Sequence, residues 1–295
     1  MMGAPERRLA RCHDGGPGPW EHLGTMDLTP ASELPLPALS TLFARCFEGY
    51  FVPIPDAPLL FEARVRGEHI SLVDSRVARV DGEAVGLVLM ARRGTVSRVA
   101  GMGIVPAWRN RKLGGDMLRP VMEEARARGD TRMLLEVIEQ NAAAVKLYER
   151  LGFQRMRRLV GFVGNPAPEA AALKEVEPLE CAWRMTEDVP WQLAPATLAG
   201  LALPARAFRL GTAVAVVGDV TASNLVVRAL AVEPEARGRG AGRRLLRALA
   251  AAFPGKPLVV SPIVPEGPCE RFFLGAGLSY MALAQLELSI PLSRG

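Results

Sequence analysis

The 295-residue sequence predicts an α/β fold made of two tandem domains. Strand-like apolar runs alternate along the chain with segments of helical periodicity, a pattern typical of a sheet flanked by helices. The stretch PAWRNRKLGGDML at 106–118 returns as PEARGRGAGRRLL at 234–246, each time between a strand-like run and an amphipathic helix. This self-similarity indicates an internal duplication. We therefore expect two mixed central sheets flanked by helices, the second domain being reduced.

The first half contains a complete set of elements. A helix is predicted at 38–47, and GYFVPIP at 49–55 ends it. Apolar residues alternate on both sides of Asp81-Gly82, which predicts a β-hairpin. The remaining predicted elements are a strand at 96–106, a helix after the repeated loop, a buried strand at 131–138, a helix at 142–152 and a strand at 153–163.

The second half repeats this order with less material and lacks room for the opening helices. Its predicted elements are strands at 180–185, 212–217 and 225–234, a helix after the loop, a buried strand at 256–264, a short helix at 269–277 and a strand at 279–290. The predicted division is a disordered tail at 1–25, a first domain at 26–164, a linker at 165–176 and a second domain at 177–295.

Composition excludes several classes of protein. No apolar run approaches the roughly 18 residues that cross a bilayer, and the start is too polar for a secretory signal. Four scattered cysteines have neither metal-ligand nor redox spacing, so we expect reduced thiols, no metal and a cytoplasmic location. The net charge of +5 is not gathered in a stripe with aromatic residues. An anionic cofactor explains it better than nucleic acid, and no membrane partner is expected.

The repeated loop predicts a phosphate site. A strand that ends in such a loop before a helix directs free backbone N–H groups and the positive end of the helix dipole at one point. Phosphate and pyrophosphate groups bind at such points.

These residues resemble the GNAT N-acetyltransferase superfamily, over nearly all of 27–164 and more weakly over 177–290. The superfamily loop pattern is Q/R-x-x-G-x-G/A. The second half matches it at Arg237, Gly240 and Gly242, whereas the first half keeps Arg109 and Gly114 but has Lys112 at the middle glycine. The segment LEVIEQNAAAVKLYERLGF at 135–153 resembles the second signature, with an asparagine, a tyrosine seven residues later and a Leu-Gly-Phe ending.

The resemblance implies that acetyl-CoA is the cosubstrate. Its predicted binding residues are Met102, Gly103, Ile104, Arg109, Arg111, Lys112, Leu113, Gly114, Gly115 and Asn141. A possible second site comprises Val232, Arg237, Gly238, Arg239, Gly240, Ala241 and Gly242. The loop after the first helix implies an acceptor pocket of Phe47, Glu48, Tyr50 and Phe51.

Two residues are candidates for proton transfer. Tyr148 resembles the tyrosine that protonates the departing thiolate, although a half-buried tyrosine with a structural role would look the same. Glu136 occupies the place of the general base in ribosomal-protein alanine acetyltransferases; alternatively it is a strand glutamate that only hydrogen-bonds a neighbour. An α-amine with a pKa near 8 is about a tenth neutral at pH 7, whereas a lysine-like amine near 10.4 is neutral about once in 2,500 molecules. A lysine-type acceptor therefore depends far more on a base.

The second half lacks these groups, because Phe273 falls opposite Tyr148 and Glu266 opposite Asn141. We therefore expect the first domain to acetylate a primary amine of a small molecule by direct attack. One alternative is a protein N-terminal or lysine acetyltransferase, for which Glu48, Asp74 and Glu139 are the acidic candidates. Another is a non-catalytic acyl-CoA-binding module. The chain is expected to be a monomer with two pseudo-dimeric domains, or a homodimer.

Overall fold

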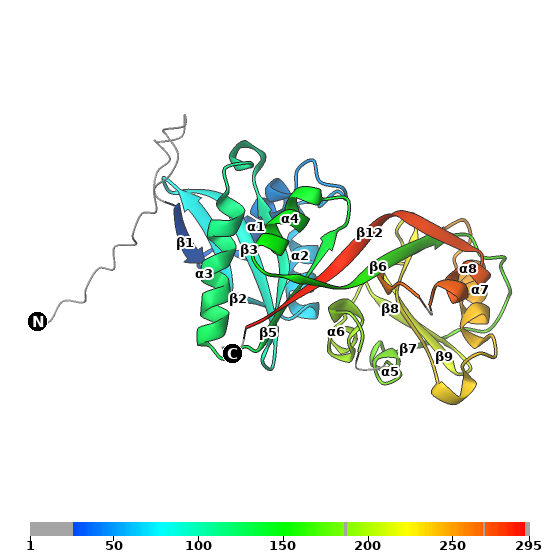
Figure 1. Ribbon diagram of the computed structural model, residues 1–295. Coiled ribbons are helices and arrows are strands. Elements are labelled where there is room, and N and C mark those ends of the chain that lie inside the picture. The colour runs from blue at the N-terminus through cyan, green and yellow to red at the C-terminus, as the bar shows by residue number, and fades with distance from the viewer. Residues whose placement is uncertain (1–25, 186–187, 268, 293–295) are drawn as a thin grey trace, which may run out of the picture.

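The computed structural model describes residues 26–185, 188–267 and 269–292, so the predicted disordered tail at 1–25 lies outside the described residues. Its strands form one continuous twelve-stranded sheet that runs through both halves of the chain (Figure 1). Helices lie on both faces: a Cβ at Gly103 would meet Cys46 of α1, whereas Met102 next to it in β4 contacts Gly114 of α3. The structure thus confirms the predicted α/β class.

The first half contains the elements that the sequence predicts, with an added first strand and second helix. They are β1 (Met26–Pro30), α1 (Leu36–Cys46), α2 (Pro58–Gly67), β2 (Ile70–Val80), β3 (Glu83–Arg93), β4 (Val96–Ile104), α3 (Leu113–Ala127), β5 (Arg132–Ile138), α4 (Ala142–Arg150) and β6 (Gln154–Gly164). Asp81 and Gly82 both have positive φ (50° and 81°), as a type I′ hairpin turn requires, so the predicted hairpin is confirmed.

The second half repeats this series in shorter form. Its elements are β7 (Lys174–Val176), α5 (Leu179–Ala182), α6 (Pro195–Ala199), β8 (Arg206–Leu210), β9 (Ala213–Val217), β10 (Leu225–Val232), α7 (Ala241–Ala252), β11 (Leu258–Pro265), α8 (Glu270–Gly275) and β12 (Leu278–Pro291). The helices α3 and α7 bury the apolar stripes read from the sequence, in separate core clusters.

The strand predicted at 180–185 is wrong, because its first residues form α5. Cys181 and Ala182 are adjacent and both buried, which a half-buried strand does not allow. The short helices α5 and α6 stand where α1 and α2 stand in the first half, so the second half keeps reduced versions of the opening helices. Apolar runs this short do not distinguish a helix from a strand.

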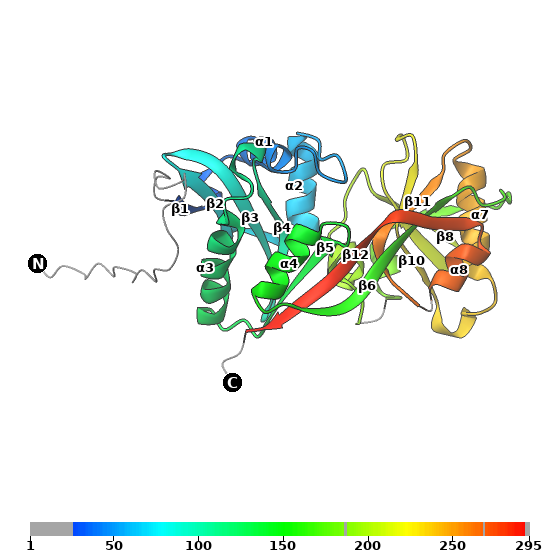
Figure 2. The same cartoon turned by 45° about the horizontal axis from the view of Figure 1, so that its top comes forward.

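The two halves exchange their last strands. The sheet order is β1-β2-β3-β4-β5-β12-β6-β11-β10-β9-β8-β7, which is symmetric about the β12–β6 pair. Residues 285–291 of β12 pair with β5, and residues 159–164 of β6 pair with β11. Figures 1 and 2 show β6 and β12 running side by side from one half to the other. The division predicted between 164 and 177 is therefore crossed by hydrogen-bonded strands in both directions.

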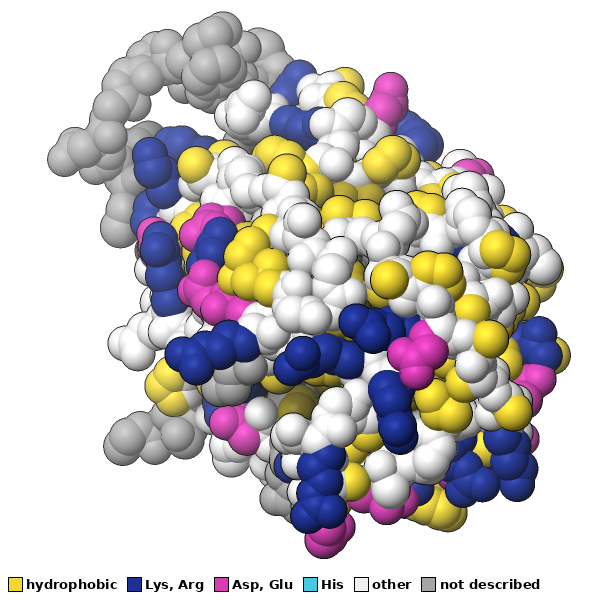
Figure 3. All heavy atoms as spheres, turned by 90° about the vertical axis from the view of Figure 1, so that its right-hand side faces the viewer, with side chains coloured by type: hydrophobic (Ala, Val, Ile, Leu, Met, Phe, Trp, Pro, Cys, Tyr) yellow, Lys and Arg dark blue, Asp and Glu magenta, His cyan; other side chains and the backbone are white. Residues whose placement is uncertain are grey.

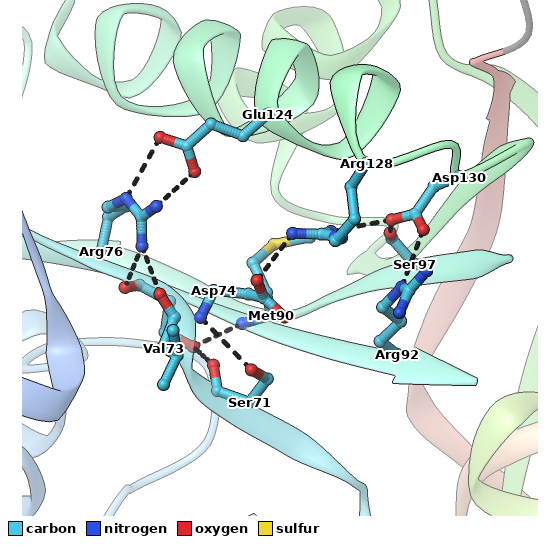
Figure 4. Close-up of polar contacts among 11 residues, drawn as sticks. Ser71, Val73, Asp74, Arg76, Met90, Arg92, Ser97, Glu124, Arg128 and Asp130 are labelled. Carbon is cyan, nitrogen blue, oxygen red and sulfur yellow. Dashed lines mark hydrogen bonds and ion pairs between the residues drawn. The ribbon is translucent and has the colours of Figure 1, made fainter. Parts of the chain in front are cut away.

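A polar network fastens the C-terminal end of α3 to the sheet (Figure 4). Arg128 donates to Asp74 at 2.6 Å and to Asp130 at 2.8 Å. Arg92 and Ser97 also donate to the buried carboxylate of Asp130. Burial would raise the pKa of Asp130, but these hydrogen bonds hold it below its usual value. Asp74, an acidic candidate for peptide binding, is thus engaged in this network.

A second polar row crosses the exchanged strands. Arg98, Glu136, Glu287 and Arg157 stand on β4, β5, β12 and β6, with Glu136 and Glu287 directly opposite each other. Arg98 pairs with Glu136 and Arg157 with Glu287. Burial raises the pKa of Glu287, and the facing charge of Glu136 adds to this effect although Arg157 opposes it. The exchange therefore brings two carboxyl groups together inside the sheet.

Replacing Glu287 by Gln tests this arrangement. A carboxyl group whose pKa is raised by folding stabilises the fold fully below its unfolded value, and that stabilisation is lost as the pH rises through the raised pKa. The wild-type free energy of unfolding should therefore fall relative to that of Glu287→Gln as the pH rises above about 4.5, measured by urea denaturation at several pH values. Glu149→Gln, at an exposed ion pair, is the matched control. Parallel curves for wild type and Glu287→Gln would contradict the account.

Candidate active site

The site forms where β4 and β5 separate. These parallel strands pair only from Val96–Val99 to Arg132–Leu135, and beyond this point β4 is bonded to β3 alone. In the second half β10 and β11 pair only at Leu225–Val226 and Leu258–Val259. Each half therefore has a sheet that opens toward its repeated loop.

The open edge of β4 presents free backbone groups. The amide of Val105 donates to the carbonyl of Val85 on the β3 side. Because alternate amides of a strand point in opposite directions, those of Met102 and Ile104 point away from β3, into the opening. This agrees with the predicted role of these residues in binding an extended ligand. Gly103 serves a different contact, since a Cβ there would lie 2.8 Å from Cys46 in α1.

The two loops have the same backbone conformation. Asn110 and Lys112 have φ of 64° and 62°, and Gly238 and Gly240 at the matching positions have 75° and 79°. Lys112 thus adopts the left-handed conformation that its glycine counterpart adopts easily, at a cost of about 1–2 kcal/mol. In the first turn of α3, the amides of Leu113 and Gly114 bond no carbonyl among the described residues. These amides and the helix dipole form a site for an anion.

The first arginine of each loop motif, Arg109 or Arg237, stabilises its loop through hydrogen bonds to backbone carbonyls. Arg109 donates from Nε to the carbonyl of Ile104 at 3.0 Å and from Nη2 to that of Glu48 at 2.7 Å. Arg237 donates from Nε to the carbonyl of Val232 at 3.1 Å. Cofactor binding was the predicted role of both arginines, but these donors are directed at the protein's own backbone. The identical contact supports the internal duplication.

A cavity of about 740 Å³ joins the loop, the opened strand and α4. This volume lies within the range of small-molecule sites. Its lining includes these predicted residues: Phe47, Tyr50, Phe51, Met102, Gly103, Ile104, Arg109, Lys112, Leu113, Gly114, Gly115, Asn141 and Tyr148. The structure thus brings the predicted cofactor and acceptor residues together in one space.

Other lining residues were not predicted. They include Cys46, Asp116, Arg119, Leu147, Arg150 and Leu151. Helical spacing is the signal that would have found two of them: Arg119 lies one turn after Gly115, and Leu151 lies three residues after Tyr148. With Lys112, the arginines Arg119 and Arg150 give the loop side of the cavity a positive charge.

Three predicted residues do not line the cavity. The guanidinium of Arg111 lies over the ring of Trp108, 4.7 Å from its centroid. Glu48 contributes its backbone carbonyl to Arg109. The carboxylate of Glu136 is buried and receives Nε and Nη2 of Arg98 at 2.8 and 2.7 Å. This contact agrees better with the structural interpretation of Glu136, a strand glutamate that hydrogen-bonds a neighbour, than with a role as general base.

Tyr148 is buried, and its side chain lines the cavity. Burial raises its pKa, and the nearby Tyr50 raises it further, so the phenol stays protonated at neutral pH. Cys46 in the same cavity has its pKa raised to about 12, mainly by burial. The thiolate is the nucleophilic form of cysteine. Because of its raised pKa, Cys46 remains a protonated thiol at neutral pH.

Asn141 has a structural role besides its place in the cavity. It is the N-cap of α4, and its Oδ1 accepts a hydrogen bond from the amide of Ala144 at 3.2 Å. Its side chain also opposes the rise that burial causes in the pKa of Tyr50. Asn141 therefore connects α4 to the loop that follows α1.

The second half copies the packing of this site without its phenol. A Cβ at Gly114 would lie 2.9 Å from Leu147, and one at the matching Gly242 would lie 2.8 Å from Phe272. Phe273 then matches Tyr148, as predicted; it is buried and stacks on Phe162 at 4.6 Å. Figure 3 shows this end of the molecule, where Lys and Arg side chains are dispersed among acidic and apolar ones.

Among the described residues, no group of three or more His, Cys, Asp and Glu side chains could hold a metal ion. Within the same ranges, no helix combines the length and the apolar character that crossing a membrane requires.

Comparison with known proteins agrees with this site. Residues 36–153 match the model of the acetyltransferase (GNAT) family. The uncharacterized N-acetyltransferase YjgM of Escherichia coli (strain K12) is 28% identical over 133 residues, which are 44% of this chain and 77% of that protein.

Solved structures extend the likeness to both halves. A tandem GNAT protein from the clavulanic acid biosynthesis pathway superposes with a TM-score of 0.64 at 14% identity, over 92% of this chain and 100% of that one. A GCN5-related N-acetyltransferase from Sphaerobacter thermophilus gives 0.60 at 15% identity, over 92% and 96% of the two chains. Residues 36–153 therefore form a GNAT-family domain, which makes the protein an acetyl-CoA-dependent acyltransferase, and the whole chain has the fold of a tandem GNAT protein.

Proposed function

We propose that the first half transfers the acetyl group of acetyl-CoA to the primary amine of a small molecule by direct attack. The observation that carries this proposal is the single cavity that joins the anion-binding loop, the open edge of β4 and the phenol of Tyr148. Each of these parts performs one task in the transfer.

The protein groups act in sequence along the cavity. The amides of Leu113 and Gly114 hold the diphosphate at the start of α3. The amides of Met102 and Ile104 bond the extended arm and the oxygen that becomes negative when the amine attacks the thioester carbonyl. As the carbon–sulfur bond breaks, Tyr148 donates its proton to the departing thiolate, the amine loses a proton to solvent, and the phenolate of Tyr148 takes a proton back from solvent.

Direct attack is favoured over an acyl-enzyme. Cys46 is the thiol in the cavity, and its pKa of about 12 keeps it protonated at neutral pH. A protonated thiol is a poor nucleophile. The acetyl group therefore passes to the amine in one transfer.

A small acceptor is favoured over a peptide. Two of the three acidic residues expected to hold a peptide amine are engaged elsewhere, Asp74 with Arg128 at 2.6 Å and Glu139 with Arg158 at 2.8 Å, and the third, Glu48, does not line the cavity. The aromatic residues beside the cavity remain as the acceptor surface.

Catalysis is assigned to the first half because Phe273 replaces the phenol in the second. Phenylalanine packs well but cannot donate a proton. Truncated halves are unsuitable for testing this assignment, because each half of the sheet contains the last strand of the other half of the chain. Point variants of the whole chain are needed.

Replacing Tyr148 by Phe removes the proposed acid and keeps the ring. We expect kcat to fall about 100-fold, with the Kd for acetyl-CoA nearly unchanged, because the hydroxyl acts on the leaving group only. Thiol release measures the first quantity and calorimetry the second. Tyr280→Phe, at a half-exposed position in the second half, is the control. An undiminished kcat in Tyr148→Phe would exclude this residue as the acid.

A matched pair of charge changes tests which loop binds. Lys112→Glu and Gly240→Glu place a carboxylate at equivalent, exposed N-cap positions with positive φ. We expect Lys112→Glu to raise the Kd for acetyl-CoA at least 10-fold, about 1.4 kcal/mol, because the carboxylate repels the diphosphate. Gly240→Glu should leave the Kd unchanged. The opposite result in calorimetry would assign binding to the second half.

A further inference from the structure

We propose that the acceptor is an amine of low basicity, such as an α-amine, attached to an apolar and preferably aromatic body. This inference rests on the proposed function and names the substrate class of the same site. It combines the shape of the acceptor end with the charges around it.

A row of aromatic rings leads from the core to the acceptor end of the cavity, where Phe47, Tyr50 and Phe51 line it. Phe43, Phe47, Tyr50 and Phe51 follow one another with centroid distances of 4.7, 5.0 and 5.3 Å, the last two contacts being edge-on. The row runs from the core to the surface, where 46% of Phe51 is exposed. Such rings bind apolar and aromatic groups with favourable geometry.

The apolar surface continues beyond the cavity. Val52 in the same loop and Leu59 and Leu60 at the start of α2 are exposed. This segment is held in place, because Asp56 accepts hydrogen bonds from Ser40 and Thr41 of α1, both at 2.8 Å. These exposed apolar side chains, which follow Phe51 in the chain, suit contact with an apolar acceptor.

Among the residues lining this end of the cavity, the neutral titratable side chains are Tyr50, Tyr148 and Cys46, and the carboxylate of Glu48 in the same loop is not part of the lining. Burial raises the pKa values of Tyr50, Tyr148 and Cys46, which therefore cannot accept a proton from the amine. Asp116 also lines the cavity, but it lies in the first turn of α3, at the anion-binding end.

The carboxylates on the α2 side are bound to arginines. Glu136 pairs with Arg98. Glu68 pairs with both Arg64 and Arg98. Burial would raise the pKa of Glu68, but the two arginines lower it to about 2. A carboxylate in this state does not take up a proton near neutral pH.

The acceptor must therefore arrive largely as the free base. At pH 7 an α-amine with a pKa near 8 has about one neutral molecule in ten, against about one in 2,500 for an alkylamine near 10.4. This difference in the neutral fraction favours the weakly basic amine by about 100-fold or more.

Four acceptors test both parts of the proposal. Phenylalanine amide and glycine amide carry α-amines, 2-phenylethylamine and ethylamine carry alkylamines, and the first member of each pair has a benzyl group. With the full chain and acetyl-CoA at pH 7, we expect kcat/KM for phenylalanine amide to exceed that for 2-phenylethylamine about 100-fold. It should exceed that for glycine amide about 10-fold, through KM. The kcat/KM for 2-phenylethylamine should rise about 10-fold per pH unit from pH 7 to pH 9, because the neutral fraction of this amine rises by that factor.

Phe51→Ala tests the aromatic row. It should raise KM for phenylalanine amide about fivefold through lost apolar contact and leave that for glycine amide unchanged. Val73→Ala, at an exposed position on β2, is the control and should change neither.

The outcomes separate this proposal from the proposed function. Equal kcat/KM for phenylalanine amide and 2-phenylethylamine at pH 7 overturns the low-basicity requirement, because it means that the protein supplies a base. Equal values for the two amides overturn the apolar requirement. Acetyl-CoA binding without transfer to any of the four overturns the acceptor class alone, whereas failure to bind acetyl-CoA overturns the proposed function.

Discussion

The separation of β4 from β5 is the constraint on which the site depends. A parallel pair that continued to its end would satisfy the amides of Met102 and Ile104 within the sheet. Because pairing stops at Val99 and Leu135, these amides face the cavity, and Tyr148 of α4 and the start of α3 reach the same space. Backbone groups of β4 and of the start of α3 thus form much of the cavity wall, so that few specific side chains are needed there.

The exchange of β6 and β12 gives the second half a structural role that is independent of catalysis. β5, which carries one wall of the opening, has β12 as its neighbour on the other side. The first half therefore depends on the second half for its sheet, even though the second half has Phe273 at the position of Tyr148. A second half without this tyrosine is compatible with the retention of its loop, core and last strand.

The local features of the fold could be read from the sequence. Asp81-Gly82 predicts its turn, the repeated loop predicts the start of α3 and of α7, and the spacing from Asn141 to Tyr148 places both in the cavity. These predictions succeed because each depends on a few consecutive residues and on backbone preferences.

The remaining features depend on partners that are distant in the chain. The sequence shows that β12 is a strand but not that it pairs with β5, since its alternation fits either neighbour. The contacts of Glu136 and Arg109 could not be predicted for the same reason. Glu136 pairs with Arg98, and Arg109 donates to the backbone carbonyls of Ile104 and Glu48. α5 is too short for its periodicity to be read.

The most direct test of the account is a crystal structure of the full chain with a non-hydrolysable thioether analogue of acetyl-CoA. The diphosphate should bind the amides at the start of α3, with the sulfur within hydrogen-bonding reach of the Tyr148 hydroxyl. Binding only at residues 237–242, or a sulfur far from Tyr148, would contradict the assignment of catalysis to the first half.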